Sequence, residues 1–89
     1  MAELARFYGL VIAIYAELGS KHNLPHFHVH YGEFHAEFSI EDGSIIIGWL
    51  PTNKRKLVDA WYVIHQQDLI ESWDKISKGN DPGKIDPLK

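Results

Sequence analysis

The chain has 89 residues, of which 45% are hydrophobic and 24% are charged. This length and composition fit one small globular domain and leave no room for a second hydrophobic core. The formal net charge of -3 argues against a protein that holds nucleic acid by bulk positive charge, although a local basic patch stays open. The chain has no cysteine, which excludes a disulfide scaffold and a thiolate zinc site.

The longest apolar run, Leu10 to Ala16, is much shorter than the roughly 20 residues of a membrane-spanning helix. The start of the chain also lacks the basic segment and the cleavage site of a signal peptide. The lack of cysteine fits a reducing compartment. We therefore expect no membrane insertion and a cytoplasmic protein.

The first predicted strand covers Phe7 to Glu17, where both alternating faces are apolar. Such a pattern is typical of a central strand that is buried on both sides. Residues 1–6 before it are expected to be extended or flexible. Glycine and proline in Gly19 to Pro25 predict a loop after it.

Two further strands are predicted in the middle of the chain. Histidines alternate with apolar residues from His26 to Tyr31, and apolar residues alternate with polar ones from Phe34 to Glu41. This period of two is that of a strand. A type II′ turn with Gly-Glu at its centre (residues 32–33) would set His30 opposite His35 and place all apolar residues on one face.

A fourth strand is expected after an Asp-Gly pair (residues 42–43), which favours a type I′ hairpin. In that register Ile40 faces Ile45, and Phe38 faces Ile47. The sheet would then be a meander of strands two, three and four, with the first strand beside it.

A long helix is predicted from Asn53 to about Lys78, with Thr52 as its N-cap. At about 1.5 Å per residue it would approach roughly 40 Å, twice the length of a typical strand. It should therefore bend or break near Gln66 to Asp68, or overhang the sheet. Residues 80–89 should be extended or flexible.

The sequence thus predicts one α+β domain over residues 1–89. It consists of a small antiparallel sheet of about four strands, with one face covered by the long or broken C-terminal helix. The helix is expected to cover the apolar face, while the histidines lie on the opposite face, open to solvent or to a partner. His65, on the apolar stripe of the helix, is assigned to the core or its margin. The residues expected beneath the helix are Phe27, Val29, Tyr31, Phe34, Phe38, Ile45 and Trp49.

The predicted histidine patch has His26 at its edge, and three functions compete for it. The first is binding of a divalent transition metal such as zinc, because imidazole is a common ligand for these ions. The second is proton-transfer hydrolysis, with one imidazole as acid and another as base. The third is a polar surface that gains charge as the pH falls toward about 6. The candidate metal ligands are His28, His30, His35 and Glu37.

A basic run, Lys54, Arg55 and Lys56, lies in the first turn of the predicted helix. Together with free backbone N–H groups, these side chains are candidates for anion binding. The alternative is three solvated surface cations.

Several segments together resemble the bacterial family named domain of unknown function 4160. They are Arg6 to Gly9, the run His22-Asn23-Leu24-Pro25-His26-Phe27-His28-Val29, Tyr31 to Glu33, Gly48 to Pro51, and the tryptophan-bearing helix. Members of the family more usually have Pro-Pro where this chain has Leu-Pro at residues 24–25. His30 and His35 are not fixed features of the family. This shifts weight to His22, His26 and His28 as catalytic candidates.

The resemblance implies a small bacterial protein, often encoded beside another small protein and sometimes assigned to toxin-antitoxin systems. We therefore expect a component of a two-protein module that binds a small protein partner. A metal-dependent or histidine-based hydrolase resembling a ribonuclease, and a metal-binding module, are the alternatives. A homo-oligomer also stays open, and nucleic-acid binding is open but unsupported by the net charge.

Overall fold

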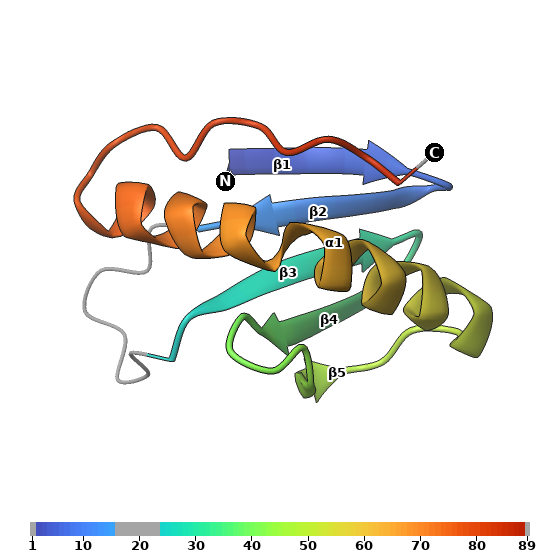
Figure 1. Ribbon diagram of the computed structural model, residues 1–89. Helices are drawn as coiled ribbons and strands as arrows, with labels where there is room; N and C mark the ends of the chain where they lie inside the picture. Colours follow the sequence, from blue (N-terminus) through green and yellow to red (C-terminus); the bar gives the residue numbers. More distant parts are fainter. Residues whose placement is uncertain (1, 16–23, 89) are drawn as a thin grey trace.

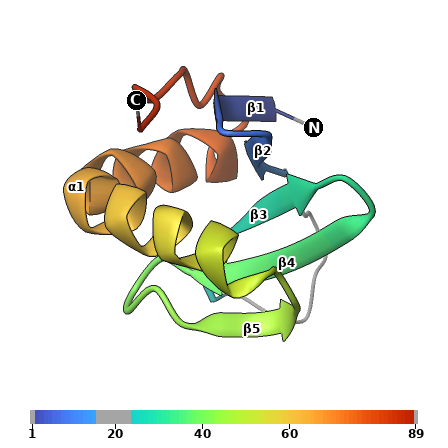
Figure 2. The same ribbon diagram turned by 90° about the vertical axis from the view of Figure 1, so that its right-hand side faces the viewer.

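The computed structural model describes residues 2–15 and 24–88. It contains one antiparallel sheet, in which five strands lie side by side in the order of the sequence. One helix packs on a single face of this sheet (Figures 1 and 2). The predicted α+β class is confirmed, with five strands where about four were expected. The elements are β1 (Ala2–Phe7), β2 (Leu10–Ile14), β3 (His26–Tyr31), β4 (Phe34–Ser39), β5 (Ile45–Gly48) and α1 (Thr52–Ser77).

The N-terminal part of the sheet differs from the prediction of a single strand from Phe7 to Glu17. The chain turns at Tyr8 and Gly9, whose φ angles are 49° and 81°, so residues 2–7 form a separate strand paired with β2. Two successive positive φ angles are those of a type I′ hairpin turn, which suits the twist of the strands. The predicted end at Glu17, and the predicted loop up to residue 23, lie outside the described residues.

The hairpin of β3 and β4 has the predicted register. His30 pairs with His35, and Tyr31 pairs with Phe34. Gly32 has a φ of 55°, as the first central residue of a type II′ turn requires. All six pairs of this hairpin therefore keep apolar and polar residues on separate faces.

The predicted register of β4 and β5 is wrong. Phe38 pairs with Ile45 and Glu37 pairs with Ile47, with a bulge between the two pairs. The predicted pair of Ile40 with Ile45 is absent. A five-residue loop, 40–44, therefore replaces the predicted two-residue turn.

Long-range contacts explain the wider loop. The N–H of Ile40 donates to the carbonyl oxygen of Pro25 at 2.9 Å. Ile40 is therefore hydrogen-bonded to the residue before β3 and does not pair with β5. Asp42 Oδ1 accepts the backbone N–H of Ser44 at 2.9 Å. Gly43 has a φ of 76°, but Asp42 lacks the second positive φ that a type I′ turn needs.

The helix spans the predicted range to within one residue at each end. Its N-cap is Pro51 and not Thr52, and no side chain caps it. The carbonyl oxygen of Pro51 instead accepts backbone N–H groups of Lys54 and Arg55, both at 2.9 Å. The helix kinks at His65 (φ -116°, ψ 18°), one residue before the predicted bend at 66–68.

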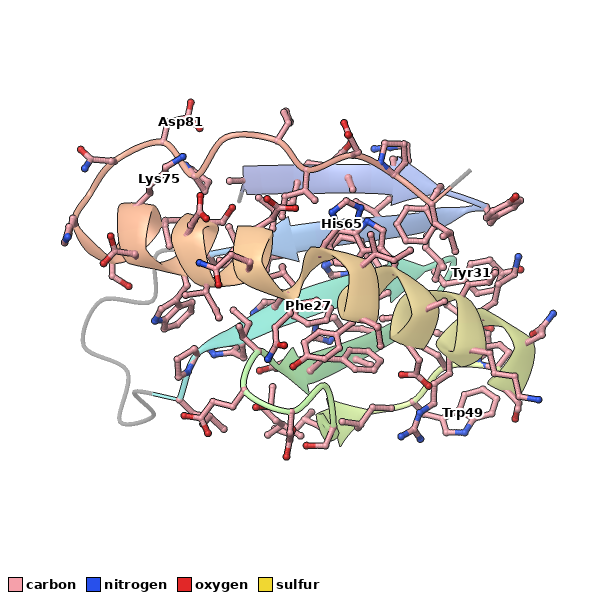
Figure 3. The ribbon with its side chains drawn as sticks, in the orientation of Figure 1. Phe27, Tyr31, Trp49, His65, Lys75 and Asp81 are labelled. Atoms are coloured by element: carbon pink, nitrogen blue, oxygen red, sulfur yellow. The ribbon has the colours of Figure 1, made fainter. Side chains whose placement is uncertain are left out.

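The hydrophobic core lies between α1 and the sheet, with Trp61 fully buried at its centre. Its ring lies 5.7 Å from that of Phe7 and 6.0 Å from that of Phe27. Figure 3 shows Phe27 near the middle of the sheet and Trp49 at the periphery. Trp49 was predicted to lie beneath the helix, but it is 58% exposed because it follows β5 at the edge of the sheet. His65 is partly buried against Trp61 at 5.4 Å, at the core margin as expected.

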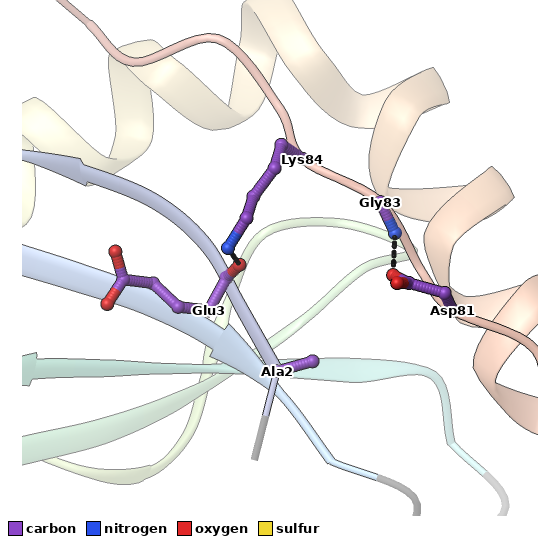
Figure 4. Close-up of a pocket in the computed structure, with 5 residues that line it drawn as sticks. All are labelled: Ala2, Glu3, Asp81, Gly83 and Lys84. Carbon is purple, nitrogen blue, oxygen red and sulfur yellow. Dashed lines mark hydrogen bonds between the residues drawn. The ribbon is translucent and has the colours of Figure 1, made fainter.

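The C-terminal segment after α1 runs alongside β1 (Figure 1). The N–H of Ile85 donates to the carbonyl oxygen of Leu4 at 2.9 Å, and Lys84 Nζ donates to that of Glu3 at 2.6 Å. A hollow at this edge (Figure 4) is lined by Glu3, Lys84 and Asp81. The carboxylate of Asp81 accepts the N–H of Gly83 at 2.8 Å. The polar groups there are thus engaged within the fold.

Two glycines with positive φ give a matched test of the sheet. A Cβ at Gly48 (φ 88°) would overlap the carbonyl oxygen of His35, whereas a Cβ at Gly32 (φ 55°) meets nothing within 4 Å. We expect Gly32→Ala to cost about 1–2 kcal/mol, from conformational strain alone, and Gly48→Ala to cost at least about 3 kcal/mol, because overlap is added to strain. Urea unfolding followed by tryptophan fluorescence measures both. Equal losses in the free energy of unfolding for the two variants would contradict the close contact of Gly48 with the backbone of His35.

Candidate metal site

The predicted histidine patch exists on the face of the sheet that α1 does not cover. His28 pairs with Glu37 across β3 and β4, and His30 pairs with His35, so the four side chains share one face. The expectation that this face is open is wrong in part. His26 and His28 are only 4% and 7% exposed, and the other three residues are half-buried.

Three side chains of the patch converge. His26, His28 and Glu37 each offer one ligand atom, and these atoms all lie within 4.8 Å of one another. Three ligands that each lie about 2.0–2.2 Å from one tetrahedral zinc ion are about 3.3–3.6 Å from one another, so the widest separation must contract by up to about 1.5 Å. Among the described residues, this is the group of ligand-type side chains close enough together to be a candidate for one ion.

The converging group shares two members with the set predicted from the sequence. Glu37 and His28 belong to both, while His26 takes the place of His30 and His35. His22, the other catalytic candidate, lies outside the described residues.

The position of His26 has a structural cause that its place in the sequence does not reveal. Its backbone pairs with Ser39, which makes it a diagonal neighbour of Glu37, and such neighbours are within reach of long side chains. The ring packs 5.3 Å from the ring of Trp73 on α1. His26 Nε2 then lies 3.8 Å from Glu37 Oε1.

The hydrogen bond of His26 determines which ring nitrogen can act as a ligand. Nδ1 lies 2.8 Å from the carbonyl oxygen of Leu24, and a carbonyl only accepts, so Nδ1 carries the proton. In the neutral ring, Nε2 therefore holds the lone pair. This lone pair and the carboxylate of Glu37 are both donors that suit a divalent cation.

A second group of rings contacts His28. His28 Nδ1 lies 3.0 Å from His35 Nε2, and the two rings are stacked at 5.2 Å. The ring of His30 is stacked on that of His35 at 4.7 Å, and its Nε2 lies 3.0 Å from the hydroxyl of Tyr15. His28, His35, His30 and Tyr15 therefore form a continuous series of contacts beside the converging group.

Tyr15 was not predicted as part of the site. Alternation along the first strand places it on the same face as Ala13, and Ala13 pairs with His28. Its ring meets the ring of His28 edge-on at 4.2 Å. Alternation along the sequence gives the face on which Tyr15 lies. Only the register of β2 against β3 shows that it lies beside His28.

The three basic residues at the start of α1 differ in their surroundings. Lys54 Nζ donates to the carbonyl oxygen of Tyr8 at 3.0 Å and lies 5.0 Å from the centre of the Tyr31 ring. Arg55 and Lys56 are exposed. Lys54 therefore stabilises the fold, and joint anion binding stays a prediction.

The fold is a five-stranded antiparallel sheet with one covering helix, and its distinguishing feature is the histidine-rich β3–β4 hairpin. A family model described as Domain of unknown function (DUF4160) matches residues 9–74. The chain belongs to this family, as its motifs indicated. The matched segment contains the whole converging group.

Searches of curated proteins and of solved structures found no match. Within residues 2–15 and 24–88, no helix combines the length and the apolar character needed to cross a bilayer. The cytoplasmic location stays a prediction.

The environment of His30 predicts a pH dependence for the metal-free protein. Burial lowers the pKa of His30 below 6.5, and the charge of nearby His35 lowers it further. A lowered pKa means that the folded state disfavours the charged ring. The stabilisation is therefore complete above about pH 6.5 and is lost as the pH falls through the pKa of the folded state.

We expect NMR titration in the presence of a chelator to show the His30 ring titrating below the value for an unfolded histidine. The free energy of unfolding should fall between pH 7.5 and pH 5, and it should fall less in a His30→Gln variant. A His30 pKa above the ordinary value would contradict this account.

Proposed function

We propose that the protein binds one divalent transition-metal ion, such as zinc, through His26, His28 and Glu37. The observation that carries the proposal is the convergence of the three ligand atoms within 4.8 Å. Two imidazoles and one carboxylate form a ligand set that zinc uses in sites with three protein ligands.

The surroundings of the ligands support this function. Metal-binding histidines almost always donate their second ring N–H to a carbonyl, a carboxylate or another acceptor, which orients the ring and fixes its tautomer. His26 has such a contact with the carbonyl oxygen of Leu24 at 2.8 Å. His28 has one with His35 at 3.0 Å. In both rings, Nδ1 makes this contact. An ion on Nε2 of His28 would leave the proton on Nδ1, which would then donate to His35 Nε2.

The ligand set also supports the hydrolase predicted from the sequence. Catalytic zinc sites have three protein ligands and use the remaining position to activate water. Under this proposal, the catalytic candidates His26 and His28 hold the ion, and acid–base roles fall to other residues. A histidine-based hydrolase without metal, and any preference for ribonucleic acid, stay predictions.

The two-protein module implied by the family resemblance is a second candidate. Its support is a group of large apolar side chains on the outer surface of α1, of which Val63 is 77% exposed, Ile64 64% and Ile70 44%. Exposed apolar patches commonly mark protein-binding surfaces. The partner and the toxin or antitoxin role stay predictions.

Metal titration tests the main proposal and separates the two ligand sets. We expect protein treated with a chelator and then dialysed to bind one zinc ion per chain in calorimetry. His28→Ala and Glu37→Gln should weaken binding at least about tenfold, because each removes a ligand. His30→Ala and His65→Ala are matched controls that should bind like the wild type. Loss of binding in the His65 control, or no binding by the wild type, would refute the site.

The contact of His35 with His28 gives a second prediction. His35→Leu removes the acceptor for His28 Nδ1–H and should weaken zinc binding about 10–100-fold. His35→Gln keeps an acceptor and should lose less. Circular dichroism checks the fold of both variants, and ¹⁵N chemical shifts report the tautomer of His28. Equal affinities for the two variants would show that His35 does not orient the ligand.

A further inference from the structure

The two edge strands of the sheet, β1 and β5, differ in what covers their outer edges. The outer edge of β1 is covered by the C-terminal segment, through the hydrogen bond from Ile85 to Leu4 and the bond from Lys84 to Glu3. In the described part of the chain, no strand pairs with the outer edge of β5. An edge of this kind presents N–H and C=O groups on which another strand can pair.

The side chains at this edge do not protect it. Proteins usually block an exposed edge with charged residues, proline or a bulge. β5 has a bulge at Ile46, but residues 43–53 contain no charged residue. Ile47 and Trp49 are each 58% exposed, and Ile46 is 41% exposed. The edge is therefore apolar and open to a further strand.

Opposite charges lie at the two ends of β5. Glu41 and Asp42 precede the strand and are exposed, and Arg55 and Lys56 follow it and are exposed. The loop before β5 and the start of α1 lie at opposite ends of this strand in Figure 1. The edge thus runs from an acidic end, through an uncharged apolar strand, to a basic end.

This pattern is complementary to itself. When two copies of one strand pair antiparallel about a two-fold axis, the start of each strand lies beside the end of the other. The acidic end of each copy then meets the basic end of the other copy, twice in one dimer. The apolar side chains of β5 meet their own counterparts between these ends. Parallel pairing would instead set acid beside acid.

We propose that the protein forms a two-fold symmetric dimer in which the β5 strands of two copies pair antiparallel and join the two sheets into one. The strand that pairs with this edge is β5 of a second copy, because antiparallel pairing sets the acidic end of each β5 beside the basic end of the other. The metal ligands lie on β3 and β4, so the dimer does not depend on the ion. The two proposals can therefore fail separately.

The first test measures mass in solution by sedimentation equilibrium at micromolar to millimolar protein. We expect a concentration-dependent dimer whose Kd rises at least about tenfold in Ile47→Lys, because the variant places a charge on the apolar edge. Val63→Lys is the matched control, since it adds the same charge to an exposed apolar position on α1. A monomeric wild type would overturn the proposal and leave the edge to a different protein. Dissociation by the Val63 variant with a persistent dimer of the Ile47 variant would also overturn it.

The second test reverses the charges. One variant carries Glu41→Lys, and the other carries both Arg55→Glu and Lys56→Glu. Each variant alone should dimerise at least about threefold more weakly than the wild type, whereas a mixture of the two should form a heterodimer that is stronger than either homodimer but weaker than the wild-type dimer, because one of the two opposite-charge contacts is restored. Circular dichroism confirms that both are folded. A mixture that associates no better than either variant alone would refute antiparallel pairing.

Discussion

The pairing of β3 with β4 is the constraint on which the candidate site depends. Side chains alternate between the two faces of a strand, so a shift of one residue would turn Glu37 away from His28 and place histidines beneath α1. The short turn at Gly32 prevents this shift, because only one register closes with two central residues and keeps Phe27 and Phe38 stacked at 5.3 Å. The same pairing therefore positions both the hydrophobic core and, on the opposite face, the converging group of His26, His28 and Glu37.

Burial gives the polar face its chemical character. Imidazoles that lose contact with water must find hydrogen-bonding partners, because an unsatisfied buried polar group costs free energy. His26 meets the carbonyl oxygen of Leu24, His28 meets His35, and His30 meets Tyr15. These contacts hold the rings in defined orientations. A surface of solvated histidines would not have this order.

Much of the fold could be predicted from the sequence because it rests on local signals. The β3–β4 register follows from alternation, and α1 follows from composition, while its kink at His65 was placed one residue too late. The β4–β5 loop could not be predicted, since the contact of Ile40 with Pro25 joins residues from separate segments. The site was predicted in part for the same reason. Alternation assigns a face to His26, but its ring contact with Trp73 on α1 and its approach to Glu37 depend on tertiary packing.

The metal binding and the dimer that we propose would use neighbouring strands. β4 contributes Glu37 to the metal group and pairs with β5 through the same residue, whose partner is Ile47. The carboxylate points to the face of the sheet, whereas strand pairing uses backbone groups in its plane. Ligation of an ion by the side chain therefore leaves the backbone pairing unchanged. The β4–β5 hairpin can thus carry a metal ligand on its face and an association surface at its edge without either requiring the other.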